Sequence, residues 1–312
     1  MTAPLALPLS AHEMCEAVQH SRAFDAARLD RVLRLDTRRA LVEVQAYTSW
    51  KTLAEHLRPG DARARETRTT RATVGDSIAW NAAGPDGRPA VTHVESLTMV
   101  TPDGRLRRVD RIASPALFKL VVGGQGLFGA IYSVTLRVES LARAVSEAES
   151  PETLELARSG APVRRLQLLL PPDRVDAFVA GARGRSGEWR IPIDTVELRR
   201  TRQEEETYLR WAQREYTEVN LGIPELVTLG GAVRVTQLRR DLIDAAIALG
   251  GTFPIACTPE ATRAQTEACY PQLAAFLAEQ RSIDPAERMA NAWLRHQRSL
   301  LGRETCEVRW DR

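Results

Sequence analysis

The chain has 312 residues, which is enough for two domains or one large one. Its 44% hydrophobic and 27% charged residues are ordinary for a soluble globular protein. The net charge of +3 is the small difference between 43 basic and 40 acidic side chains, so nothing points to nucleic acid as a partner. No apolar run approaches the roughly 20 residues that span a bilayer, and we expect no signal peptide.

The cysteines and histidines do not suggest a metal site. No C-x-x-C pair occurs among the four cysteines, a pattern typical of scattered thiols in the cytoplasm, which is the expected localisation. No two histidines stand four residues apart, so we expect no bound metal. A basic cluster within residues 61–71 could be an anion site, but a solvated loop is the favoured interpretation.

The first half of the chain predicts short helices and strands, from apolar spacing, caps and turns. The expected helices are Ala11–His20 with Ser10 as its cap, Trp50–Leu57, and Ser114–Val122. The expected strands are Leu29–Leu35, Ala40–Gln45, Val94–Val100, Arg105–Val109 and Ile131–Val138.

Four glycines crowd into the segment VVGGQGLFG, where the backbone can turn sharply and approach a ligand closely. Gly124–Gly129 matches the dinucleotide pattern G-x-G-x-x-G, which requires a strand before it and a helix after it. Here a helix precedes the glycines and a strand follows them. The order of elements therefore argues against a Rossmann motif.

Beyond about Ser140 the pattern changes, and Glu147–Pro151 is typical of a link between domains. The expected strands are Val163–Leu170, Thr195–Thr201, Val219–Ile223 and Thr252–Cys257. The expected helices are Pro172–Ala182, Gln203–Tyr216, Asp241–Leu249, Glu260–Cys269, Pro271–Glu279 and Pro285–Leu301. This alternation predicts an α+β, ferredoxin-like second domain followed by a helical tail.

Several motifs in one order resemble a known family. They are LDRVLRLD…LVEVQAYTSWKTLAEHL, TVGDSIAWNAAG, VESLTMVTPDGRLRRVDR and SPALFKLVVGGQGLFGAIYSVTLRV. Together they resemble the flavin-binding domain of the vanillyl-alcohol-oxidase and p-cresol-methylhydroxylase type. The tail YPQLAAFLAEQRSIDPAERMANAWLRH resembles bacterial members of that family. The resemblance implies an α+β fold with a two-subdomain FAD-binding PCMH-type domain at 1–140 and a substrate domain at 141–312.

The resemblance also implies a function: an FAD-dependent oxidoreductase that oxidises an alcohol-type small molecule and passes its electrons to oxygen or another acceptor. Main-chain amides and hydroxyls near the glycines would hold the anionic diphosphate and the flavin. By motif, the cofactor-binding residues would be Thr73, Val74, Gly75, Ser77, Asn81, Gly84, Gly126, Gly129 and Ile131.

The sequence also departs from the family. The glycine-rich diphosphate loop expected between the first helix and LDRVL is missing, Asp76 replaces the second glycine of a pair, and Ala83 stands where relatives often have histidine. An alternative is therefore a flavin-free remnant that acts as a scaffold for a protein partner. No catalytic residue is evident, since Arg263, Arg295 and His296 are more readily explained as helix-surface residues than as pocket residues.

Overall fold

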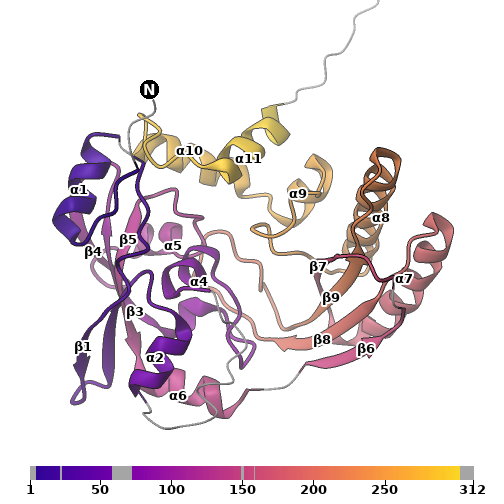
Figure 1. The fold of residues 1–312 in the computed structure, drawn as a ribbon, viewed down its shortest axis with the longest axis horizontal. Coiled ribbons are helices and arrows are strands. Elements are labelled where there is room, and N and C mark those ends of the chain that lie inside the picture. Colours follow the sequence, from indigo (N-terminus) through magenta and orange to yellow (C-terminus); the bar gives the residue numbers. More distant parts are fainter. Residues whose placement is uncertain (1–4, 22, 58–71, 149–150, 158, 303–312) are drawn as a thin grey trace, which may run out of the picture. The chain divides into compact units, whose positions relative to one another are not determined.

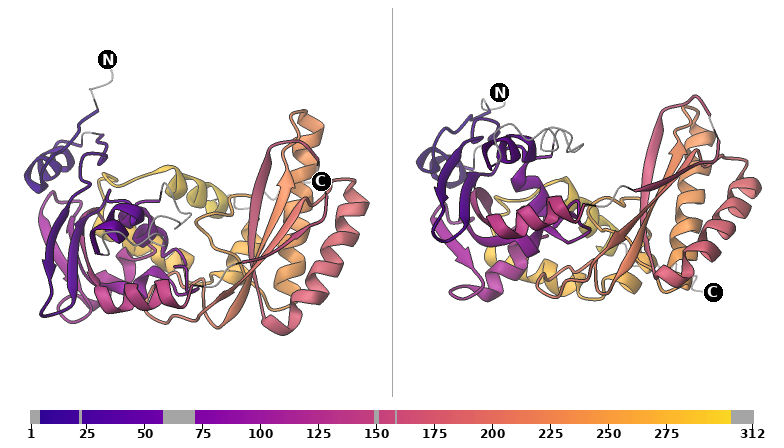
Figure 2. Two further views of the ribbon diagram at one scale, coloured as in Figure 1. Left: turned by 60° about the horizontal axis from the view of Figure 1, so that its bottom comes forward. Right: turned by 90° about the horizontal axis from the view of Figure 1, so that it is seen from below.

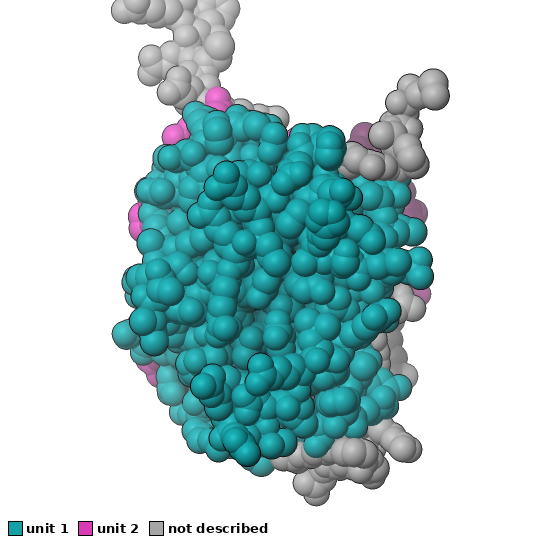
Figure 3. Space-filling view, turned by 90° about the vertical axis from the view of Figure 1, so that its left-hand side faces the viewer, with its two compact units in different colours: residues 1–150, 200–215, 274–289 teal, residues 151–199, 216–273, 290–312 magenta. Residues whose placement is uncertain are grey.

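The computed structural model describes residues 5–21, 23–57, 72–148, 151–157 and 159–302, so the basic cluster within residues 61–71 lies outside the described residues. The chain divides into two compact units, each discontinuous in sequence. Unit 1 comprises residues 1–150, 200–215 and 274–289, and unit 2 comprises residues 151–199, 216–273 and 290–312. Figure 3 colours the two units separately.

Unit 1 is built on a five-stranded antiparallel sheet with the order β1-β2-β5-β3-β4 (Figure 1). Its strands are β1 (Val32–Asp36), β2 (Leu41–Gln45), β3 (Val94–Val100), β4 (Leu106–Asp110) and β5 (Ala130–Arg137). The predicted strands are confirmed, although the first begins three residues later. Val42, Val44, Val134 and Leu136 are fully buried, because alternate residues of paired strands share one face of the sheet.

Short helices accompany the sheet of unit 1. They are α1 (Ala11–Gln19), α2 (Trp50–Leu57), α4 (Val74–Trp80), η1 (Ala90–His93), α5 (Pro115–Val121) and α6 (Val138–Ser146). The predicted cap of the first helix is confirmed, since the Ser10 hydroxyl accepts from the amide of Glu13. Met14 and Val18 of α1 pack with Leu29 and Val100 in one buried cluster.

Two later segments also belong to unit 1. Residues 202–211, which we call the strap, follow β8 and form no helix, so the predicted helix Gln203–Tyr216 is wrong. The carboxylate of Glu204 accepts from the amides of Glu206 and Thr207, a local turn that competes with helix formation. The second segment includes most of α10 (Leu273–Ile283), whose Phe276 meets Phe128 edge to face.

Unit 2 contains a four-stranded sheet with the order β6-β8-β9-β7. Its strands are β6 (Glu152–Glu155), β7 (Val163–Leu170), β8 (Thr195–Thr201) and β9 (Tyr216–Pro224). After η2 (Pro172–Arg174), helix α7 (Val175–Trp189) joins β7 to β8, and α8 (Leu229–Ala248) follows β9. These two helices lie side by side on one face of the sheet (Figure 2). The succession β7-α7-β8-β9-α8 agrees with the α+β, ferredoxin-like expectation.

The remaining expectations for unit 2 need correction. The predicted strand Thr252–Cys257 is reduced to one bridge between Leu169 and Thr252. Helix α8 begins well before the predicted Asp241, because Thr228 caps it by accepting from the amide of Gly231. The last helices are α9 (Arg263–Cys269) and α11 (Ala292–Gly302). The observed helix α11 therefore begins seven residues after the start of the predicted helix Pro285–Leu301.

Candidate functional site

The amides at the start of α4 are all used within the protein. Thr73 caps the helix, and its hydroxyl accepts from the amide of Asp76 at 3.1 Å. The amides of Val74 and Gly75 donate to the carbonyls of Thr48 and Ala46 at 2.9 and 2.7 Å. The side chain of Asp76 is exposed, so it points away from these amides.

Two further contacts hold α4 close to Ala46 and to α2. A Cβ on Gly75 would lie 2.8 Å from the carbonyl oxygen of Ala46, so glycine is required for this close approach. The hydroxyl of Ser77 accepts a hydrogen bond of 2.8 Å from the indole of Trp50 on α2. Val74 is fully buried. Thr73, Val74, Gly75 and Ser77 are thus brought together, and each has a structural role.

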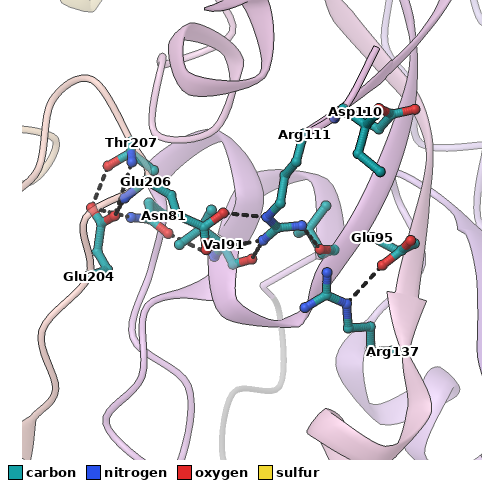
Figure 4. A network of polar contacts seen from close by, with 11 residues as sticks. Asn81, Val91, Glu95, Asp110, Arg111, Arg137, Glu204, Glu206 and Thr207 are labelled. Carbon is teal, nitrogen blue, oxygen red and sulfur yellow. Dashed lines mark hydrogen bonds and ion pairs between the residues drawn. The ribbon is translucent and has the colours of Figure 1, made fainter. Parts of the chain in front are cut away.

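Asn81 ends α4 in the left-handed conformation with φ of 50° and is almost fully buried, at 1% exposure. Its Oδ1 accepts from the amide of Val91 at 2.9 Å, and its Nδ2 donates to Glu204 of the strap at 3.3 Å. Figure 4 shows this network. The sequence does indicate Asn81, but its partner in the strap is too distant along the chain to be found by pattern.

Arg111 ties the strap to the sheet. Its guanidinium pairs with the carboxylate of Glu206, donates to the carbonyls of Val91 and Val94, and stacks on the ring of Phe118 with 4.6 Å to the centroid. Figure 4 shows Arg111 between the strap and the sheet. Sequence reasoning missed this residue, which appeared only as the last residue of the motif VESLTMVTPDGRLRRVDR.

The glycine turn that follows α5 has one side packed and one side open. Gly129 has φ of +148°, and a Cβ there would lie 2.5 Å from the carbonyl oxygen of Val100. Gly126 has φ of +73°, and a Cβ there would meet nothing within 4 Å. Ile131 lies in β5, paired with Met99. Of the glycines expected at the cofactor, Gly126 is the one beside open space.

Gly84 lies in a tight turn beside a buried imidazole. Its amide donates to the carbonyl of Arg88 at 2.7 Å, and a Cβ on it would lie 3.4 Å from Nε2 of His93. Nδ1 of His93 is 2.7 Å from the hydroxyl of Ser140. Burial lowers the pKa of His93. The charge of Asp86 raises this pKa in part, and the charge of Arg88 lowers it further.

The sheet of unit 2 has one apolar face and one mainly polar face, on which the buried Leu169 lies opposite Glu218. Val219, Leu221 and Ile223 of β9 are fully buried, and Glu218 and Asn220 alternate with them on the opposite face. The side chains that share this polar face come from three strands. They are Arg165, Gln167, Glu197, Arg199, Glu218 and Asn220. Sequence analysis missed the cluster, although the polar residues that alternate within β9 were a signal for it.

Glu218 is the most buried charged residue of this face, at 6% exposure. Its Oε1 accepts a 2.6 Å hydrogen bond from Nδ2 of Asn220. Burial raises the pKa of Glu218, although this hydrogen bond and the charge of Arg199 lower it. The pKa of the Cys257 thiol is raised by burial and, to a smaller extent, by the charge of Glu218. The face therefore holds a carboxyl group that ionises less readily than an exposed glutamate.

Three residues that the sequence analysis interprets as helix-surface rather than pocket residues lie on helices near the end of the described chain. The guanidinium of Arg263 pairs with Glu267 at 2.8 Å and donates to the carbonyl of Leu301 at 3.1 Å. Arg295 is exposed and His296 is half-buried, both on α11. Among the described residues, no group of three or more acidic, histidine or cysteine side chains could hold a metal ion. No helix within the described ranges is long and apolar enough to cross a membrane.

Comparison with known proteins bears on the cofactor. Residues 12–110, about a third of the chain, match the family model of an FAD binding domain. The cofactor that this match indicates is FAD. The match supports an FAD-binding PCMH-type domain and, in general, a flavin-dependent oxidoreductase, and it does not favour the flavin-free alternative. No curated protein matches the chain.

The described residues fit FAD in one place and not in another. The amides of Val74, Gly75 and Asp76 already have acceptors within the protein, so the start of α4 offers no free donor to a diphosphate. The turn at Gly126 does fit, because its backbone borders open space and lacks a side chain that would block approach.

Proposed function

We propose that the protein is a flavin-dependent oxidoreductase of the vanillyl-alcohol-oxidase type that oxidises an alcohol-type small molecule. The observation that carries the proposal is the match of residues 12–110 to an FAD binding domain. In this proposal residues 1–140 hold the cofactor, and residues 141–312 contact the substrate. When bound, FAD supplies the electron acceptor that alcohol oxidation requires, and oxygen or another acceptor reoxidises it.

For the cofactor, we assign the closest main-chain contact to the turn at Gly126, supported by its positive φ and open surroundings. Gly129 and Ile131 follow in the same segment as backbone positions, and Gly84 is a separate backbone position of the proposal, in the turn beside His93. In this proposal Thr73, Val74, Gly75, Ser77 and Asn81 act by fixing α4, because their polar groups or packing are engaged within the protein. The proposal assigns no arginine or lysine to the diphosphate of the cofactor.

For the substrate, we assign Glu218 and Asn220 to a hydroxyl group. A carboxylate accepts a hydrogen bond from an alcohol, and an amide can both donate and accept. Burial raises the pKa of Glu218, so its carboxylate is a stronger base than that of an exposed glutamate, which favours a group that takes up a proton from the substrate during oxidation. The ion pair between Arg165 and Glu197, 2.9 Å long, borders the same face and favours a polar substrate.

The first test is cofactor uptake. Protein incubated with FAD and freed of unbound ligand should be yellow, and heating should release flavin into the supernatant. A panel of primary and secondary alcohols with an artificial electron acceptor then tests turnover. A preparation that stays colourless after incubation with FAD would contradict the proposed function.

A variant then tests the assignment of Glu218. Glu218→Gln keeps the shape but cannot take up a proton, so kcat/KM for the best alcohol should fall about a hundredfold. The control is Glu152→Gln, which removes the same charge from the exposed strand β6 and should leave kcat/KM unchanged. If Glu218→Gln has the kcat/KM of the wild type, oxidation of the substrate does not depend on this carboxyl group.

A further inference from the structure

The carboxylate of Glu204 is saturated with hydrogen bonds although it lies in an irregular segment. Glu204 is 6% exposed, and it accepts from the amides of Glu206 and Thr207 at 2.7 and 3.0 Å. It also accepts from the hydroxyl of Thr207 and from Nδ2 of Asn81, the latter at 3.3 Å. A buried carboxylate with this many donors is held in one orientation, because each donor would lose its partner if it moved.

The strap makes a second hydrogen bond to Asn81, through Trp211. Nε1 of Trp211 donates to the backbone carbonyl of Asn81 at 3.0 Å, and Trp211 is itself 5% exposed. Since Asn81 ends α4 with a positive φ, its backbone departs from the helix and needs such partners to stay in place. The strap thus fixes both the side chain and the main chain of Asn81.

Asn81 in turn supports the glycine turn. A Cβ on Gly123 would lie 3.3 Å from Cβ of Asn81 and 4.0 Å from Cβ of Thr207, so Gly123 rests on α4 and on the strap together. The amides of Gly123 and Gln125 donate to the carbonyls of Ile78 and Ala79, at 2.9 and 3.0 Å. The position of Gly126, which follows directly, depends on these contacts.

We propose that Glu204 is a positioning residue for the cofactor, which sets the turn at Gly126 through Asn81 and Gly123. The inference rests on the proposed function and extends it, because the strap lies far beyond the end of the FAD binding domain match at Asp110. The cofactor site of this chain is then completed by a segment that arrives after β8. Glu204 does not touch the cofactor in this proposal.

The strap offers a matched control for a merely structural role. Glu206 lies two residues from Glu204 and also binds unit 1, but its partner is Arg111 rather than Asn81. Glu204→Gln and Glu206→Gln each remove one carboxylate from the same segment. If the strap only stabilises the fold, both variants should lower the melting temperature and neither should change the binding of FAD.

The experiment measures the Kd for FAD by flavin fluorescence and the melting temperature of each variant. Glu204→Gln turns an NH₂ group toward the existing donors, so the Kd for FAD should rise about tenfold, while Glu206→Gln stays within about twofold of the wild type. Trp211→Phe removes only the bond to the carbonyl of Asn81, and its Kd should rise about threefold. A folded Glu204→Gln or Trp211→Phe with the Kd of the wild type would overturn the inference.

A second readout needs no cofactor. Amide hydrogen exchange in residues 123–128 should accelerate at least tenfold in Glu204→Gln and stay unchanged in Glu206→Gln, because of these two side chains only that of Glu204 bonds to Asn81. Equal exchange in the two variants would overturn the positioning role. If the wild type takes up no FAD, the proposed function fails separately, and the exchange measurement still decides whether Glu204 positions the turn.

Discussion

The indole of Trp50 donates a 2.8 Å hydrogen bond to the hydroxyl of Ser77, joining α2 to α4. The sequence places Ser77 among the cofactor residues, yet its hydroxyl oxygen is engaged by another helix. Ser77 is 7% exposed, so the bond is shielded from water. The pair therefore joins α2 to α4 in addition to the hydrogen bond from the amide of Val74 to the carbonyl of Thr48.

We expect Trp50→Phe and Ser77→Ala each to lower the free energy of unfolding by about 1 kcal/mol, since each removes one shielded hydrogen bond. The loss of unfolding free energy in the double variant should be little larger than that of the less stable single variant, because both changes break the same hydrogen bond. Urea unfolding of all four proteins measures this coupling. The Kd for FAD should stay unchanged in Trp50→Phe, and additive losses of stability would show that the bond is unimportant.

The two glycines of the turn provide a contrast in stability. Gly129→Ala places a Cβ 2.4 Å from Cε of Met99 and against the carbonyl of Val100, so we expect a loss on the order of 3 kcal/mol. Gly126→Ala meets open space and should cost only about 1 kcal/mol, from its positive φ of 73°. Denaturant unfolding measures both values. Similar losses for the two variants would contradict the packing argument.

The buried imidazole of His93 makes stability depend on pH. Its pKa is lowered in the folded protein, whereas an unfolded histidine ionises near pH 6.5, so the unfolded state binds more protons as the pH falls. The stability that neutral His93 provides is thus fully present above about pH 6.5 and is lost as the pH falls below it. His93→Gln should flatten the fall in unfolding free energy between pH 6.5 and 5.

The control for this effect is His56→Gln, which replaces an exposed histidine on α2. Its unfolding free energy should stay within about 0.5 kcal/mol of the wild type, because an exposed substitution away from packed contacts changes stability little. A wild-type slope that persists in His93→Gln would mean that other groups carry the pH dependence.

Local patterns predicted much of the fold. The cap at Ser10, the hairpin between β3 and β4 and the strand after the glycines were all legible, because caps, turns and alternation act over a few residues. The strap was predicted as a helix for the same reason: its acidic start and aromatic spacing are local signals. In the folded protein, Glu204 instead bonds to Asn81 and to its own neighbours.

The sequence by itself determined the strands of unit 1, the glycine positions and the resemblance to an FAD domain, since these depend on residue type and spacing. Only the tertiary structure decided which polar groups are used within the protein and which border open space. Thr73 and Ser77 are bonded to neighbours, whereas Gly126 faces open space. The physical reason is that a hydrogen-bond partner is chosen by proximity in space, and contacts such as Asn81 with Glu204 join residues that no short pattern connects.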